Sequence, residues 1–206
     1  MIKIGITGGI GSGKSYVAAL LREKGVEVYD TDSRAKQLTL SHPSIREGLI
    51  ALLGEHVYDD GCLNRTLVAS YLFASPENAQ RINELIHPCV YDDFCTWAEA
   101  LRQKGAEWVA MESAILFESG FERAVDCTWA VSAPLEVRLH RAMQRDQASE
   151  EQIRARMAAQ MSDQEKCERA DFVLVNDGKC DVKLQVEQLL QKLRARLFHL
   201  SLDKGT

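Results

Sequence analysis

The sequence of 206 residues lacks several features that mark whole classes of proteins. It has no apolar run near the ~20 residues that a membrane-spanning helix needs, and its N-terminal strand pattern turns into glycines too early for a signal peptide. None of its 6 cysteines stands in a CxxC pair, so neither a disulfide framework nor a zinc site is expected. We therefore expect reduced thiols and a cytoplasmic location.

An excess of basic residues is also missing. The chain has 25 Lys and Arg against 30 Asp and Glu, a formal net charge of −5 at pH 7, which argues against nucleic acid and anionic membranes as partners. It contains no internal repeat, low-complexity tract or long linker. We expect one globular domain, as a monomer or a weak homo-oligomer.

Short apolar runs alternate with helical patterns, which predicts an α/β fold with a parallel central sheet covered on both faces. The predicted strands span residues 2–7, 26–29, 107–111, 127–133 and 172–175. Between the second and third strands, residues 44–104 are helical almost throughout, with predicted breaks at Gly54, at residues 59–62, at Ser75-Pro76 and at His87-Pro88. This stretch predicts a helical insertion into the sheet domain.

The first strand is followed by Gly8-x-x-x-x-Gly13-Lys14-Ser15 and then by a helical pattern, which is the sequence and the context of a phosphate-binding P-loop. In such a loop, backbone N–H groups surround an anion and Lys14 contacts the β- and γ-phosphates. We expect the Ser15 hydroxyl to hold Mg²⁺ at the N-terminus of the following helix. The sequence therefore predicts a three-layer P-loop NTPase fold that binds a nucleoside triphosphate.

Two carboxylates, Asp30 and Asp32, directly follow the second strand. The carboxyl ends of parallel strands face the ligand crevice, so a carboxylate there lies near the γ-phosphate. We expect Asp30 to cap the next helix. Asp32 is the candidate general base, or a Mg²⁺ ligand through a bound water.

A basic cluster follows the fourth strand. Spacings of three and four residues place Arg138, Arg141 and Arg145 on one helix face. Phosphoryl transfer needs positive charge over the phosphates and a lid that excludes water. We expect residues 144–163 to form a mobile lid, with Arg141 and Arg145 as the best candidate clamps on the phosphates. Arg154 and Arg156 are weaker candidates, since solvated helix surface is the default for such residues.

Taken together, the motifs make the chain resemble the dephospho-coenzyme A kinase family along almost its whole length. The matching segments are Thr7 to Ser15, Asp30-Thr-Asp32 with Ala35, Asn64-Arg65, His87-Pro88, Leu116-Phe-Glu118, Arg141 with Gln144-Arg145, and Ala170 to Gly178. Tyr16 and the segment Glu112 to Ile115 depart from the family pattern.

The resemblance implies MgATP-dependent phosphorylation of the ribose 3′-hydroxyl of dephospho-coenzyme A, giving coenzyme A and ADP, the last step of coenzyme A biosynthesis. It also implies three parts of one domain: a nucleotide-binding core over residues 1–40, 106–145 and 170–206, a helical substrate lobe over 41–105, and a lid over 146–169. By position, Asp32 is the catalytic base, Lys14 stabilises the phosphates and Arg141 contacts the triphosphate.

The remaining site residues follow from the same resemblance. The expected ATP contacts are Gly9, Gly11, Ser12, Gly13, Lys14, Ser15, Tyr16, Arg141, Arg145 and Asn176, the last beside the adenine. The expected substrate contacts are Thr7, Asp32, Arg65, His87, Leu116 and Glu118.

Three of the substrate contacts have simpler alternatives. His87 can cap a helix break before Pro88. Glu118 can be a surface acid, and Arg65 can pair with Asp59 or Asp60 instead of an acceptor phosphate.

Two other functions compete with this interpretation. A GTPase-like switch needs an Asn-Lys-x-Asp motif after a strand and an Asp-x-x-Gly after the third strand, and the sequence has neither. Another P-loop kinase for a nucleoside, a nucleotide or a small acid would share the ATP half of the site. The acceptor therefore decides between the kinases.

Overall fold

A computed structural model of the chain describes residues 1–59 and 61–202, with side chains up to residue 195. Its central sheet has five parallel strands in the order β2-β5-β1-β6-β7. The strands are β1 (Ile2–Thr7), β2 (Glu27–Asp30), β5 (Trp108–Glu112), β6 (Cys127–Ser132) and β7 (Phe172–Val175). The predicted fold class is confirmed, and each predicted strand lies within one residue of the observed one at both ends.

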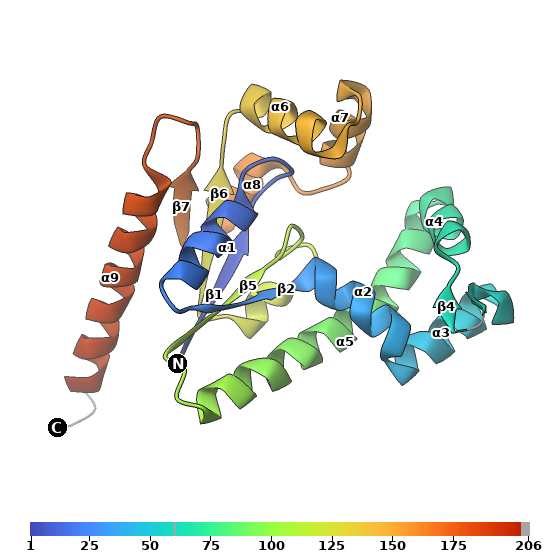
Figure 1. Cartoon of the computed structure of the whole chain (residues 1–206), viewed down its shortest axis with the longest axis horizontal. Coiled ribbons are helices and arrows are strands. Elements are labelled where there is room, and N and C mark those ends of the chain that lie inside the picture. The colour runs from blue at the N-terminus through green and yellow to red at the C-terminus, as the bar shows by residue number, and fades with distance from the viewer. Residues whose placement is uncertain (60, 203–206) are drawn as a thin grey trace.

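Helices cover both faces of this sheet (Figure 1). Trp108 and Ala110 of β5 pack in one cluster with α1 (Lys14–Glu23) and α9 (Val182–Leu202), whereas Val109 and Met111 pack in a second cluster with α5 (Pro76–Gln103). Alternate residues of a strand thus face opposite layers. The apolar stripe of α9 is core packing at Val186, Leu189 and Leu193, and the side chain of Leu197, in the same stripe, lies outside the described residues.

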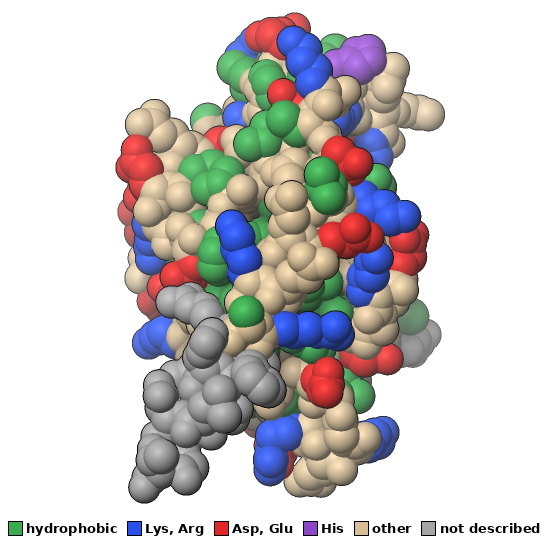
Figure 2. Space-filling model, turned by 90° about the vertical axis from the view of Figure 1, so that its left-hand side faces the viewer, with side chains coloured by type: hydrophobic (Ala, Val, Ile, Leu, Met, Phe, Trp, Pro, Cys, Tyr) green, Lys and Arg blue, Asp and Glu red, His purple; other side chains and the backbone are tan. Residues whose placement is uncertain are grey.

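The surface beside α9 carries interspersed basic, acidic and apolar side chains (Figure 2). Within the described residues, no helix is long and apolar enough to cross a bilayer. Cys62, Cys89, Cys95, Cys167 and Cys180 are free thiols.

The insertion between β2 and β5 forms a separate helical layer at one side of the sheet (Figure 1). It contains α2 (Thr31–Ser41), α3 (Pro43–Leu53), a 3₁₀ helix (Glu55–Val57), a small hairpin of β3 (Tyr58–Asp59) and β4 (Cys62–Leu63), α4 (Arg65–Ala74) and α5. The hairpin occupies the predicted break at residues 59–62.

One predicted break is wrong. Helix α5 continues through His87 and Pro88. A proline inside a helix removes one hydrogen bond and costs about 3 kcal/mol, but Ile82 before it and Val90 and Phe94 after it are buried in the same core. Burial of apolar side chains on both sides of Pro88 offsets that cost.

Two helices occupy most of the charged stretch over residues 149–169. Helix α6 (Leu135–Asp146) and α7 (Glu150–Ala158) project beyond the end of the sheet, while α8 (Asp163–Arg169) lies against β6 (Figure 1). The projecting pair has its own small core of Leu139, Ala142 and Ile153. We call α6 and α7 the lid helices.

Candidate active site

The phosphate loop, residues 8–15, connects the buried strand β1 to the N-terminus of α1. Gly11 and Gly13 have φ angles of 78° and 99°, which side chains rarely adopt. A Cβ atom at Gly11 would lie 2.2 Å from the carbonyl oxygen of Arg138. Because that neighbour is backbone, only glycine fits, and the loop is held tightly under α6.

Lys14 lies across this loop. Its Nζ donates hydrogen bonds to the carbonyl oxygens of Gly8 at 2.9 Å and Gly9 at 3.3 Å. Burial lowers the pKa of Lys14 to about 8, against the opposing effect of the Glu112 and Asp32 carboxylates. The charged form of a buried ammonium is stabilised by an anionic partner, and the predicted contact between Lys14 and the phosphates would supply one.

Glu112 is a site residue that the sequence analysis missed. It ends β5, lies beside Asp30 in the sheet register, and accepts a hydrogen bond of 2.6 Å from the Ser15 hydroxyl. Burial raises the pKa of Glu112, while the hydrogen bond from Ser15 opposes that rise. The rule that selected Asp32, a carboxylate at the carboxyl end of a buried strand, would also have selected Glu112.

Asp30 and Asp32 have different surroundings. Asp30 caps α2, and its side chain accepts from the backbone N–H groups of Asp32 at 3.0 Å and Ser33 at 3.3 Å. The capping interpretation is confirmed. Asp32 is exposed in the first turn of α2. Its carboxylate makes no hydrogen bond or ion pair within the described residues, and it lies near enough to raise the pKa of Lys14. It is the carboxylate of this pair that remains available to a ligand.

Arg141 and Asn176 join the lid helix α6 to the phosphate loop. Arg141 donates to the backbone oxygen of Asn176 at 3.0 Å and to its side-chain oxygen at 3.4 Å. The Asn176 amide in turn donates to the backbone oxygen of Ser12 at 2.8 Å. These contacts bring together three of the predicted ATP contacts from distant parts of the chain.

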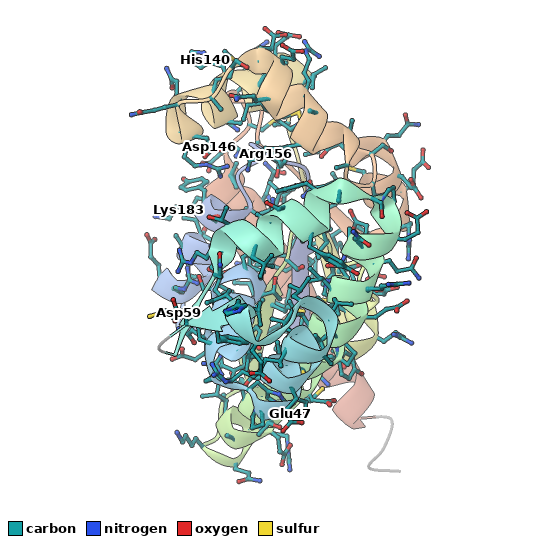
Figure 3. All side chains as sticks on the ribbon, turned by 90° about the vertical axis from the view of Figure 1, so that its right-hand side faces the viewer. Glu47, Asp59, His140, Asp146, Arg156 and Lys183 are labelled. Atoms are coloured by element: carbon teal, nitrogen blue, oxygen red, sulfur yellow. The ribbon has the colours of Figure 1, made fainter. Side chains whose placement is uncertain are left out.

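The other lid arginines make local ion pairs. Arg145 and Arg156 both pair with Asp146, at 2.7 and 2.6 Å, and Figure 3 shows Asp146 and Arg156 together beneath the lid helices. Arg145 nevertheless contributes to the lowered pKa of Lys14, so its charge acts on the phosphate loop. Arg154 pairs with Glu150 of its own helix at 2.7 Å.

Arg138, which was not among the predicted clamps, lies against the phosphate loop. A Cβ atom at Gly9 would lie 2.1 Å from its Nη1. Its guanidinium is 3.5 Å from the carboxylate of Asp163, the first residue of α8, and that carboxylate also accepts from the Gly9 N–H at 3.1 Å. Only the folded chain brings these residues together.

A cleft of about 1310 Å³ opens between α4, α5 and residues 118–123. We call it the acceptor cleft because it contains two of the residues that are predicted to contact the acceptor. Two predicted substrate residues, His87 and Glu118, line it, together with Leu72, Phe73, Ala74, Ser75, Pro76, Ala79, Gln80, Asn83, Glu84, Pro88, Tyr91, Asp92, Ser119, Phe121, Arg123 and Ala159. Burial lowers the pKa of His87, whose ring packs against Phe121 at 5.6 Å between centroids. Since α5 continues past His87, its role as the cap of a helix break is excluded.

The other four predicted substrate contacts, Thr7, Asp32, Arg65 and Leu116, lie outside the cleft lining. Leu116 is 0% exposed in the core, so a direct contact with an acceptor would require the core to open. Thr7 is also buried, and Tyr16 is half-exposed on α1. Arg65 is exposed in the first turn of α4 and makes no ion pair with Asp59, while Asp60 lies outside the described residues.

The chain is similar to several known proteins. A family model described as dephospho-CoA kinase matches residues 2–181. A dephospho-CoA kinase of Bacteroides fragilis is 49% identical over 204 residues, covering 99% of this chain and 98% of the relative, and that of Porphyromonas gingivalis is 41% identical over 197 residues, covering 95% and 96%. A crystal structure of a Thermus thermophilus protein, 37% identical, superposes with a TM-score of 0.76 over 95% of this chain and 97% of the other.

Proposed function

The chain belongs to the dephospho-CoA kinase family, and from that membership and the site we propose how it phosphorylates the ribose 3′-hydroxyl of dephospho-CoA. ATP is the phosphoryl donor, and the products are CoA and ADP. The observation that carries this proposal is the position of Asp32, an exposed carboxylate at the carboxyl end of β2 that acts electrostatically on Lys14.

The acceptor cleft supports a large acceptor. Ligand pockets commonly measure roughly 300–1,000 Å³, and this cleft of about 1310 Å³ exceeds that range. Dephospho-CoA combines a nucleotide with a long flexible arm, so it suits such a space better than a nucleoside or a small acid does. His87 and Glu118 are two of the polar residues that line the cleft, beside apolar residues such as Leu72.

The transfer step requires three actions from this chain. Asp32 accepts the proton of the 3′-hydroxyl as its oxygen forms a bond to the γ-phosphorus and the bond from that phosphorus to the ADP oxygen breaks. Lys14 places positive charge on the β- and γ-phosphates. Arg141, anchored at Asn176, contacts the triphosphate, and the lid helices exclude water from the transfer.

The donor set beside the phosphate loop fits Mg²⁺. The hydroxyl of Ser15 and the carboxylate of Glu112 are oxygen ligands 2.6 Å apart, and Mg²⁺ is bound by oxygen ligands in phosphoryl-transfer sites. We propose that these two groups hold the metal of MgATP, with Asp32 reaching it through a water. When bound, the metal neutralises charge on the β- and γ-phosphates.

Three further points belong to the same proposal. The division into a nucleotide-binding core, a substrate lobe and a lid assigns α1 to the first, α4 and α5 to the second, and α7 to the third. A cytoplasmic location and a monomeric or weakly homo-oligomeric state complete it. Analytical ultracentrifugation measures the last of these directly.

The proposal is tested by an ADP-release assay with MgATP and a panel of acceptors. Dephospho-CoA is compared with adenosine, AMP, shikimate and no acceptor, and the position of the new phosphate is determined by NMR. We expect rapid turnover with dephospho-CoA and with no other acceptor of the panel, and a 3′-phosphate in the product. Turnover only with another acceptor, or slow hydrolysis without any, would overturn the proposed acceptor.

A further inference from the structure

Lys166 of α8 is a fully buried lysine to which the transfer mechanism gives no role. Its side chain is 0% exposed, and it is among the largest fully buried side chains of the described residues. A buried ammonium is costly unless it is paired and hydrogen-bonded. Its partners therefore show what it does.

The partners of Lys166 lie on the loop that follows β5. Its Nζ is 2.9 Å from Oε1 of Glu118 and donates a hydrogen bond to the backbone oxygen of Ala114. Two points of one loop are thus fixed by a single ammonium. Glu118 is also part of the wall of the acceptor cleft.

The same carboxylate oxygen of Glu118 has a second donor. The backbone N–H of Met161, in the segment between α7 and α8, donates to it at 3.0 Å. The neighbouring Ala159 lines the acceptor cleft from the lid side. One carboxylate therefore connects the acceptor cleft to the segment that carries the lid helices, and Lys166 compensates its charge.

We propose that Lys166 is a positioning residue that holds Glu118 in the acceptor cleft and thereby ties the acceptor site to the lid segment. Without the ammonium, Glu118 loses its ion pair and its fixed orientation, and residues 114–118 lose a support. Binding of the acceptor then weakens, whereas the phosphate loop keeps its own contacts. This inference rests on the proposed function for the identity of the acceptor.

Arg169 provides a matched control on the same helix. Its guanidinium lies 4.5 Å from the Phe117 ring and pairs with Glu122 at 3.3 Å, so it contacts the same loop without touching Glu118. Removing its charge perturbs the contact between α8 and the loop in a similar way. It leaves the carboxylate in the cleft untouched.

The experiment is a double-mutant cycle of Lys166→Met and Glu118→Gln, with Lys166→Arg as the conservative variant and Arg169→Met as the control. The KM values of dephospho-CoA and of MgATP are measured separately. In the Lys166→Met variant we expect the KM of dephospho-CoA to rise about 10-fold with the KM of MgATP little changed. Lys166→Arg restores most of the loss, and Arg169→Met has a much smaller effect on the KM of dephospho-CoA.

The cycle separates positioning from a purely structural role. If Lys166 acts through Glu118, Lys166→Met has little further effect in the Glu118→Gln background. Additive effects of the two changes, or an equal rise in both KM values, would overturn the proposal. If Lys166→Met does not fold, the Glu118→Gln variant still tests the proposal. Glu118 is only partly buried, so this variant should fold, and it should raise the KM of dephospho-CoA without changing that of MgATP.

The same double-mutant cycle is repeated with the free energy of unfolding in urea as the measured quantity, which needs no acceptor. Coupling between the two substitutions is expected there as well, since the ion pair is present in the ligand-free protein. If the two substitutions are coupled in unfolding but the enzyme does not phosphorylate dephospho-CoA, the proposed function is wrong and the role of Lys166 stands. Additivity in unfolding would overturn the assignment of Lys166 whichever acceptor the enzyme uses.

Discussion

In the phosphate loop a single extra carbon at Gly11 would come within 2.2 Å of a backbone oxygen, whereas the acceptor cleft leaves about 1310 Å³ between the side chains of separate elements. In the proposed function the loop holds a group that is the same in every nucleoside triphosphate, which suits a site built largely from backbone. The cleft is proposed to recognise one particular acceptor, which suits a site built from side chains. We therefore expect substitutions in the loop to affect catalysis and folding, and substitutions in the cleft to affect acceptor binding.

The largest effect is expected at Lys14. Lys14→Met removes the charge over the β- and γ-phosphates and should lower turnover by ~10³ or more. Steady-state kinetics with MgATP and dephospho-CoA measures this loss. Lys104→Met, at the exposed end of α5, is the matched control and should leave turnover unchanged. Normal kinetics in Lys14→Met would remove the phosphate loop from the mechanism.

A comparison of alanine variants at Gly11 and Gly105 distinguishes the cost of backbone strain from the cost of close packing. Their φ angles are 78° and 86°, but a Cβ atom at Gly105 meets nothing within 4 Å. Both alanine variants pay roughly 1–2 kcal/mol for the left-handed conformation, and Gly11→Ala adds an overpacking cost of about 1–3 kcal/mol. Urea unfolding should show Gly11→Ala as the less stable of the two. Equal losses of stability would show that α6 does not confine the loop.

The pH dependence of kcat/KM for MgATP should report the protonation state of Lys14. Its pKa of about 8 in the free enzyme means that its charge is present below that pH and is lost as the pH rises through it. Since the phosphates are bound by the protonated form, kcat/KM for MgATP should fall above pH ~8, by about tenfold per pH unit at the limit. Lys14→Arg keeps its charge in this range and should lack that decline. An identical alkaline decline in both enzymes would assign it to another group.

The smallest effect is expected at the rim of the acceptor cleft. Phe73 is 83% exposed there, and contact between its ring and the acceptor should contribute about 1 kcal/mol. Phe73→Ala should raise the KM of dephospho-CoA about fivefold, the factor to which that energy corresponds, and leave the KM of MgATP unchanged. Leu184→Ala, which removes an exposed apolar side chain of α9, is the control. A rise in the KM of MgATP instead would contradict the division of the site into two halves.

The sequence predicted the loop far better than the cleft, and the reason is physical. The glycine spacing, the strand before it and the helix after it are all contained in about twenty consecutive residues, so the phosphate loop was visible without a structure. The next strand is also short and local, so the two aspartates that follow it, Asp30 and Asp32, were visible as well. The five strands were equally visible, because each is a short continuous apolar run.

Contacts between distant residues were not visible. Glu112 meets Ser15 across 97 positions and Asp163 meets Gly9 across 154, and no local pattern marks either pair. The burial of Leu116 in the core likewise depends on packing between elements that are distant in the sequence. The prediction for Pro88 failed for a related reason, since packing of α5 on both sides of the proline outweighs its local tendency to end a helix.

In the proposed transfer Asp32 accepts the proton of the 3′-hydroxyl, and the first variant to measure is Asp32→Asn. Turnover of dephospho-CoA is measured together with the dissociation constant of MgATP by titration calorimetry. The account predicts a loss of turnover of ~10² or more with the affinity for MgATP changed by less than about twofold. Turnover within about twofold of the unaltered enzyme would contradict the role of Asp32 as the base.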